Sequence, residues 1–161
     1  MSKKSGKKNK NVPAGTIALN KKARHEYTLT NKFEAGLVLL GWEVKSLRES
    51  RIQLNESHII IRKGEAWLYG ALITPLSSAS THVETQPLRE RKLLLHRKEL
   101  SVLIGAVERK GFSLIPTAMY WKSGKIKLEF YLAQGKKLHD KRQADKQKDW
   151  DRQKQRVLRR G

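Results

Sequence analysis

The side chains that most often carry enzyme chemistry are scattered along this chain without a catalytic pattern. Its five histidines form no HExxH motif, and no GxSxG motif is present. Cysteine is absent, which excludes a disulfide framework and thiolate metal ligands. Glu34 and Glu43 could form a carboxylate pair for acid–base chemistry or magnesium, but two strand carboxylates are usually solvated surface. We therefore predict a protein that is not an enzyme and needs no metal or cofactor.

Lysine and arginine give the chain a net charge of +20 in 161 residues. The first 24 residues carry +8, residues 25–134 carry +5 and the last 27 carry +7, so most of the excess lies in two tails. Such a charge predicts a polyanionic partner, and RNA or DNA is favoured over an anionic membrane. The longest apolar run, Ala66–Ile73, is much shorter than the roughly 18 residues of a membrane span. The basic N-terminus lacks the apolar region of a signal peptide, so we expect a cytoplasmic protein.

The segment Glu34–Arg48, EAGLVLLGWEVKSLR, has an apolar centre bracketed by charged residues. From Trp42 onward its side chains alternate, with Trp42 and Val44 on one face and charged residues on the other. This period predicts a buried strand with one wet side. We expect its charged face to belong to a binding surface.

Two glycine-containing turns predict two hairpins. The turns at Gly64 and Gly124 separate four predicted strands: His58–Arg62, Ala66–Ile73, Phe112–Trp121 and Ile126–Ala133. Apolar residues alternate in the last strand and should face the core. Pro116 cannot donate to a strand ladder, so we expect it at an edge or a bulge.

The clearest predicted helix is Arg97–Lys110. Its apolar residues recur at helical spacing from Leu100 to Val107, and Gly111 follows as a stop. It should cover an open end of a barrel. Residues 24–29 alternate and predict a first strand, residues 50–56 a polar turn or short helix, and residues 74–91 a long connection. Six strands and one helix predict a mainly β protein, a six-stranded antiparallel OB-like Greek-key barrel.

Four blocks of the sequence closely resemble one bacterial family. They occur in order across residues 20–142: NKKARHEY (Asn20–Tyr27), Glu34–Arg48, RERKLLLH (Arg89–His96) and GKKLHDKR (Gly135–Arg142). The family is small protein B, or SsrA-binding protein. The resemblance implies an OB-type barrel that binds the tRNA-like domain of transfer-messenger RNA (SsrA) and delivers it to stalled ribosomes for trans-translation. It also implies the ribosome and elongation factor Tu as partners.

A basic face of the barrel is the predicted RNA-binding site. Lysine and arginine should contact phosphates, and a few other groups should position the RNA. The resemblance implies that Glu34 accepts a hydrogen bond from an RNA loop and that Leu94 packs on RNA. His96 stands where family members often have Asn. The predicted RNA-binding residues are Asn20, Lys21, Lys22, His25, Glu34, Lys45, Arg48, Arg91, Lys92, Leu94 and His96.

The last 27 residues differ from the rest of the chain. From Leu138 to Arg160 there is no glycine or proline, and apolar residues are sparse, with no stripe that could hold the segment on a core. We expect a tail that is disordered alone and helical when bound. The resemblance implies that it enters the decoding centre and messenger channel. The predicted ribosome-binding residues are Gly135, Lys136, Lys137, His139, Asp140, Lys141, Arg142 and Trp150.

The predicted organisation is a disordered basic arm over residues 1–19, an RNA-binding barrel over 20–134 and a basic tail over 135–161. Two alternatives stay open. A basic ribosomal structural protein with an OB-like fold would share the charge and the tails, but it would stay on ribosomal subunits in high salt. A metal-dependent RNA-processing enzyme would need more clustered carboxylates than this sequence offers.

Overall fold

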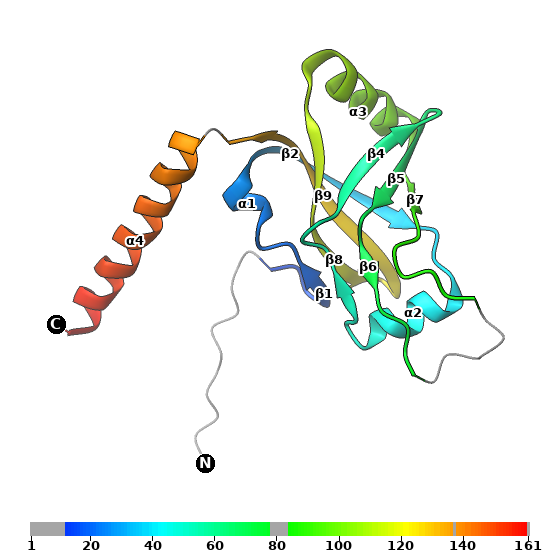
Figure 1. The fold of residues 1–161 in the computed structure, drawn as a ribbon, viewed down its shortest axis with the longest axis horizontal. Coiled ribbons are helices and arrows are strands. Elements are labelled where there is room, and N and C mark those ends of the chain that lie inside the picture. Colours follow the sequence, from blue (N-terminus) through cyan, green and yellow to red (C-terminus); the bar gives the residue numbers. More distant parts are fainter. Residues whose placement is uncertain (1–11, 78–83, 137, 161) are drawn as a thin grey trace.

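Antiparallel strands close into a barrel in the computed structural model, which describes residues 12–77, 84–136 and 138–160. Six of the seven strands of the main sheet form a ring because β8 and β9 also pair (Figure 1). The ring order is β2 (Tyr27–Leu37), β9 (Lys125–Gly135), β8 (Ser113–Lys122), β4 (His58–Arg62), β5 (Glu65–Tyr69) and β7 (Arg91–Leu94). The predicted mainly β, six-stranded antiparallel barrel is confirmed.

Three short strands complete the β structure of the described residues. The strand β1 (Thr16–Leu19) pairs with the second half of β8. The strands β3 (Ile52–Gln53) and β6 (Leu72–Ile73) form a separate two-stranded sheet. The predicted arm over residues 1–19 therefore includes a strand, because β1 pairs with β8 in the main sheet. Its residues 1–11 lie outside the described part of the chain.

The barrel interior is filled by alternate residues of its strands. In β9 the predicted inward set, Ile126, Leu128, Phe130 and Leu132, is buried. Phe130 stacks on Phe33 of β2 with ring centroids 5.5 Å apart. Burying each such side chain contributes about 1.5–3 kcal/mol, so this period fixes which face of β9 points outward.

Both predicted hairpins are present, as β4–β5 and β8–β9. Their turns place two consecutive residues at positive φ: Lys63 and Gly64 in the first, Ser123 and Gly124 in the second. This is the mirror-image turn that matches the twist of paired strands, and glycine adopts it without strain. Pro116 lies at a register shift between β8 and β9, as expected.

Helix α3 (Arg97–Lys110) has the predicted bounds, and Gly111 ends it in the left-handed conformation with a φ of 68°. Helices α3 and α2 (Gly41–Arg48) lie at opposite ends of the barrel (Figure 1). Leu103 and Ala106 of α3 are buried against the core. The prediction of a helix that covers one end of the barrel is therefore confirmed.

The second half of the Glu34–Arg48 segment is a helix, so the strand predicted there is wrong. The strand β2 ends at Leu37, and α2 begins at Gly41. The buried residues of α2 are Trp42, Glu43, Ser46 and Leu47, which share one face at helical spacing. Over a few residues the alternation of Trp42 and Val44 could not be distinguished from a helical period.

The predicted first strand over 24–29 is also wrong at its start. Residues Ala23–Glu26 form a single helical turn, α1, and β2 begins at Tyr27. The two earliest predicted strands thus correspond to one long strand, β2. The sixth strand of the ring is β7, which begins where the predicted connection over 74–91 ends.

The C-terminal segment is one continuous helix, α4 (Leu138–Arg160), which extends away from the barrel (Figure 1). Trp150, Val157 and Leu158 are 57%, 71% and 80% exposed. They lie on one side of α4 and line a shallow hollow with Lys154. These three residues form a short apolar stripe that does not pack on the core, in agreement with the expectation that nothing holds this segment on the barrel. The dependence of the helix on a bound partner stays a prediction.

Candidate nucleic-acid interface

Strands β7, β2, β9 and β8 present one continuous outer surface, here called the β2–β9 face. Phe33 and Ala35 point into the barrel, so their neighbours in β2 point outward. The register sets Gly36 opposite Leu94 on one side and Lys127 on the other. The outward side chains that define this face are Lys32, Glu34, Leu94, Tyr120, Lys122, Lys127, Glu129 and Tyr131.

Glu34 is the best-held charged group on the β2–β9 face. The Tyr120 hydroxyl donates a hydrogen bond to Oε2 of Glu34, and the Lys122 ammonium lies 3.1 Å from Oε1 and 3.2 Å from Oε2. The bond from Tyr120 lowers the pKa of Glu34, and Lys122 and Lys127 lower it further against the opposing effect of burial. The side chain keeps 32% exposure. Glu34 is therefore an ionised acceptor at neutral pH.

Leu94 forms an apolar knob beside this carboxylate. It is 54% exposed, whereas its neighbour Leu93 is buried. A methyl group placed on Gly36 would lie 3.5 Å from Leu94 Cβ and 3.7 Å from Lys127 Nζ. Leu94 and Lys127 therefore flank the bare backbone of Gly36, two residues along β2 from Glu34.

A groove of about 710 Å³ runs along the other end of the same face. Its lining includes Glu34, Lys122, Lys32 and Tyr131. Arg24 also lines it and places its guanidinium 5.8 Å from the Tyr131 ring centroid. Cations, an acceptor and an aromatic ring thus surround one hollow, and these are the groups that contact RNA phosphates, sugars and bases.

Two more predicted residues adjoin this face. Lys92 shares the outward side of β7 with Leu94 and forms an ion pair of 3.0 Å with Glu65. His96 is exposed at the start of α3, where its backbone N–H donates to Glu99 at 3.3 Å. Its imidazole is therefore available near Leu94.

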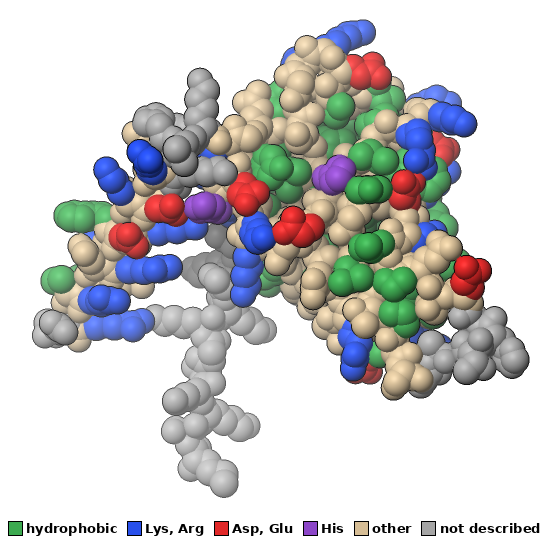
Figure 2. All heavy atoms as spheres, viewed as in Figure 1, with side chains coloured by type: hydrophobic (Ala, Val, Ile, Leu, Met, Phe, Trp, Pro, Cys, Tyr) green, Lys and Arg blue, Asp and Glu red, His purple; other side chains and the backbone are tan. Residues whose placement is uncertain are grey.

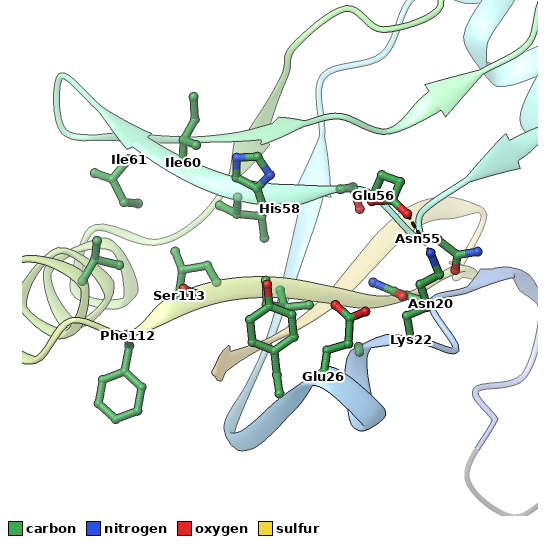
Figure 3. A pocket seen from close by; sticks show the side chains of 17 residues that line it. Asn20, Lys22, Glu26, Asn55, Glu56, His58, Ile60, Ile61, Phe112 and Ser113 are labelled. Carbon is green, nitrogen blue, oxygen red and sulfur yellow. Dashed lines mark hydrogen bonds and ion pairs between the residues drawn. The ribbon is translucent and has the colours of Figure 1, made fainter. Parts of the chain in front are cut away.

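The structure does not bring the first predicted block onto this face as a unit. Asn20 is 6% exposed, and its side-chain amide donates to the Pro116 carbonyl at 2.9 Å within the fold. Lys22 forms an ion pair of 2.8 Å with Glu56 at the rim of a second cleft, of about 620 Å³ (Figure 3). Lys21 is exposed beside Arg24, near the groove.

Arg91 was predicted to contact RNA, and the structure contradicts this because the side chain is fully buried. Its guanidinium donates to Glu43, and also to the carbonyls of Ala71 at 2.9 Å and Pro87 at 3.1 Å. Arg89 donates to the same carboxylate. A buried charge must be paired and hydrogen-bonded. Arg91 therefore ties α2 and the chain before β7 to the barrel.

Glu43 was expected on a wet face and is instead 0% exposed. Burial raises the pKa of Glu43, but hydrogen bonds from Arg89, the Leu40 backbone and Arg91 outweigh it and bring the pKa below its ordinary value. Lys45 and Arg48 occupy the exposed side of the same helix. They are free to contact a phosphate, but they project from α2 and not from the β2–β9 face.

The root of the tail is attached to α1. The Lys136 ammonium donates to the Arg24 carbonyl at 2.8 Å, and its backbone N–H donates to the Glu26 carbonyl at 2.9 Å. His25 Nε2 lies 3.1 Å from Asp145 Oδ1 of α4. His25 thus faces the tail. Of the other predicted ribosome-binding residues, Gly135 ends β9 opposite Tyr27, Arg142 and Trp150 are exposed, and Lys137 and the side chains of His139, Asp140 and Lys141 lie outside the description.

A family model described as SmpB protein matches residues 17–160. The chain belongs to the SmpB family. The SsrA-binding protein of Pseudoalteromonas translucida (strain TAC 125) is 62% identical over 145 residues, which cover 90% of this chain and 91% of that relative. A chain of the solved structure "tmRNA-SmpB: a journey to the center of the bacterial ribosome" matches with a TM-score of 0.63 and 40% identity, covering 78% of this chain and 87% of that one.

In this SmpB-family chain the cations are unevenly distributed. Figure 2 shows one side of the molecule, where Lys and Arg side chains gather along α4 and at the margins of the barrel. Hydrophobic side chains occupy the middle of that side. This side of the barrel therefore offers few contacts to RNA phosphates.

Sequence reasoning missed six residues of the interface: Arg24, Lys32, Tyr120, Lys122, Lys127 and Tyr131. Alternation in β9 indicated that Lys127 and Tyr131 face outward, but it gave no strand neighbours. Only the register places Lys127 beside Gly36. Tyr120 lies in the predicted strand Phe112–Trp121, whose sequence showed no sign of its contact with Glu34.

The SmpB-family barrel shows no arrangement of metal ligands among the residues that the structure describes. No helix in the described ranges is long and apolar enough to cross a membrane.

Proposed function

We propose that this chain is an RNA-binding adaptor that binds the tRNA-like domain of transfer-messenger RNA and delivers it to stalled ribosomes for trans-translation. The observation that carries this proposal is the 62% identity to an SsrA-binding protein over nine-tenths of the chain. The likeness to the tmRNA–SmpB structure supports it, at 40% identity.

The β2–β9 face is the proposed RNA-binding surface. Lys32, Lys122 and Lys127 supply phosphate contacts, which give most of the affinity but no register. Glu34 and Leu94 position the RNA. An unpaired nucleotide exposes its 2′-hydroxyl and its base amines, which can donate hydrogen bonds to the Glu34 carboxylate. It also exposes the flat face of its base, on which Leu94 can pack. Lys21, Lys92 and His96 extend this surface at its margins.

The tail is the proposed ribosome-binding element. A helix of 23 residues is about 35 Å long, and α4 carries lysine and arginine along that length. The messenger channel beyond the decoding centre is walled by RNA phosphates, and such a basic helix can line it. We therefore propose that the protein acts in the bacterial cytoplasm, with elongation factor Tu in the delivery complex.

The role is binding and delivery, with no chemical step on the RNA. On the β2–β9 face, Tyr120 and Lys122 hold the carboxylate of Glu34 in place as an acceptor. They do not form a nucleophile and base in contact.

Purification of the protein from its own bacterium, followed by sequencing of the bound RNA, tests this proposal. We expect one dominant small RNA with a tRNA-like acceptor end. A mixture of ribosomal RNA fragments would contradict it and favour a ribosomal structural protein. That alternative also predicts retention on ribosomal subunits in high salt, where an adaptor dissociates.

A further inference from the structure

The two donors that hold Glu34 come from a strand that is not its neighbour. Glu34 lies on β2, whereas Tyr120 and Lys122 lie on β8, and β9 runs between them. Two strand spacings separate β2 from β8, about 10 Å, and only long side chains can cross that distance. The contact therefore depends on the register of three strands.

Tyr120 is committed to this contact. Its side chain is 7% exposed, and its hydroxyl donates to Glu34 Oε2. Burial, and then the bond to Glu34, raises the pKa of Tyr120 above its ordinary value, so the hydroxyl keeps its proton at any physiological pH. A buried hydroxyl with one such partner cannot rotate to another without losing a charge-assisted bond.

Glu34 retains acceptor capacity after these contacts. A carboxylate has about four lone-pair sites, and among the described residues only Tyr120 and Lys122 donate to it. Lys122 contributes from its exposed ammonium. Glu34 lines the groove together with Lys122 and Lys32.

The neighbouring carboxylate, Glu129, does not share this role. It lies opposite Glu34 in the register, but its Oε1 accepts from the Thr117 hydroxyl at 2.8 Å. Thr117 therefore holds Glu129 towards β8, and Glu34 is the acceptor fixed by an aromatic hydroxyl and a cation together.

We propose that Tyr120 is a positioning residue for RNA binding, which fixes the Glu34 carboxylate at the groove so that its free lone pairs accept a 2′-hydroxyl or base amine of an unpaired nucleotide. This rests on the proposed function. Tyr120 does not touch the RNA and acts only through Glu34. The cations Arg24, Lys32 and Lys122 around the groove bind the flanking phosphates.

The test measures the affinity of full-length variants for a transcript of the tRNA-like domain of transfer-messenger RNA. Tyr120→Phe removes one hydroxyl and should weaken binding about tenfold. Glu34→Gln should weaken it at least as much. The double variant should bind no more weakly than Glu34→Gln alone, since Tyr120 acts through that carboxylate. Tyr69→Phe is the matched control, because Tyr69 is an exposed tyrosine of β5, and it should bind normally.

The pH profile separates positioning from a general structural effect. In Tyr120→Phe the pKa of Glu34 rises towards its ordinary value, because the largest lowering influence is gone. As the pH falls from 7, affinity should therefore begin to drop at a higher pH in Tyr120→Phe than in the wild type. Glu34→Gln lacks this carboxylate, so its affinity should not show the fall with decreasing pH seen in the wild type and in Tyr120→Phe.

Lys122→Met provides a second variant that disturbs no buried atom. It should lose more affinity than Lys125→Met, and the difference should become smaller in the Glu34→Gln background, where only the phosphate contact of Lys122 is left to lose. If Tyr120→Phe and Lys122→Met match their controls while Glu34→Gln binds weakly, positioning is overturned and the proposed function stands. Additive losses in the double variant would also overturn it. Normal binding by Glu34→Gln would show that Glu34 does not contact the RNA, which would also overturn the role of Tyr120. The proposed function would then be tested by sequencing the RNA that co-purifies with the protein.

Discussion

At the scale of single residues, the charge of a side chain and the role of that side chain differ. Glu34 is an acid on the β2–β9 face, which is proposed to bind RNA, a polyanion. Its carboxylate is nevertheless held by Tyr120 and Lys122 and kept ionised. Arg91 is a base in a motif that indicates RNA binding, yet it is sealed inside against Glu43. Local geometry decides which charge stays at the surface.

Glu34→Lys should weaken RNA binding even though it adds two positive charges to the protein. The reason is that a lysine cannot accept the hydrogen bond and would lie against Lys122. The matched control is Glu108→Lys on the exposed side of α3, which should bind as well as the wild type or slightly better. Titration of labelled RNA measures both. Tighter binding by Glu34→Lys would return Glu34 to ordinary surface.

Glu43→Gln should destabilise the fold by about 3–5 kcal/mol, because it leaves the buried Arg91 charge unpaired. Urea unfolding measures this cost. Glu65→Gln breaks a half-exposed pair and serves as control, with an expected change below about 1 kcal/mol. Equal stability of the two variants would contradict the structural role of Glu43.

The loss of unfolding free energy in Glu43→Gln should depend on pH in one direction only. The folded pKa of Glu43 lies below its ordinary value of 4.5. The stability that ionised Glu43 contributes is therefore fully present above pH 4.5 and is lost as the pH falls through the folded pKa. The gap in unfolding free energy between wild type and Glu43→Gln should be constant at neutral pH and narrow only in acid.

At the scale of elements, α4 makes few contacts with the barrel and carries a positive charge of its own. It touches the rest of the described chain mainly through α1, where Asp145 meets His25. Its exposed Trp150, Val157 and Leu158 form an apolar stripe that a partner could cover. An isolated helix without a buried face is marginal in water, so docking should stabilise it.

Deletion of residues 138–161 should leave the barrel folded and lower RNA affinity only modestly, through loss of long-range attraction. Ribosome rescue should be abolished. The double variant Gln147→Gly and Gln155→Gly should impair rescue partly, because each glycine costs a helix up to about 1 kcal/mol. Rescue of stalled ribosomes in a reconstituted translation system measures this. Full rescue by the truncated protein would contradict the role of the tail.

At the scale of the whole molecule, the net charge of +20 is distributed as +8 over residues 1–24, +5 over residues 25–134 and +7 over the last 27 residues, most of which form a helix that extends away from the barrel. If the barrel neutralises about five phosphates, the logarithm of affinity should fall against the logarithm of salt concentration with a slope of roughly −3 to −5. Binding curves for the truncated protein at several salt concentrations measure the slope. A slope near zero would rule out electrostatic binding by the barrel.

The sequence alone determined the elements whose signal is local. The period of Arg97–Lys110, the stop at Gly111 and the turns at Gly64 and Gly124 depend on neighbours within a few residues, and each is where it was predicted. The four family blocks likewise indicated the barrel, and with it the partner. Glu34 and Leu94 were predicted as site residues for the same reason.

Tertiary structure decided what depends on contacts distant in sequence. Residues 42–47 alternate as a strand would, but they form a helix, whose side carrying Trp42, Glu43 and Leu47 is buried against the core. Arg91 is internal because Glu43, 48 residues away, is buried beside it. The partnership of Glu34 with Tyr120 spans 86 residues and two strand spacings. No local pattern encodes such a pairing, since the register of three strands must form before the two side chains meet.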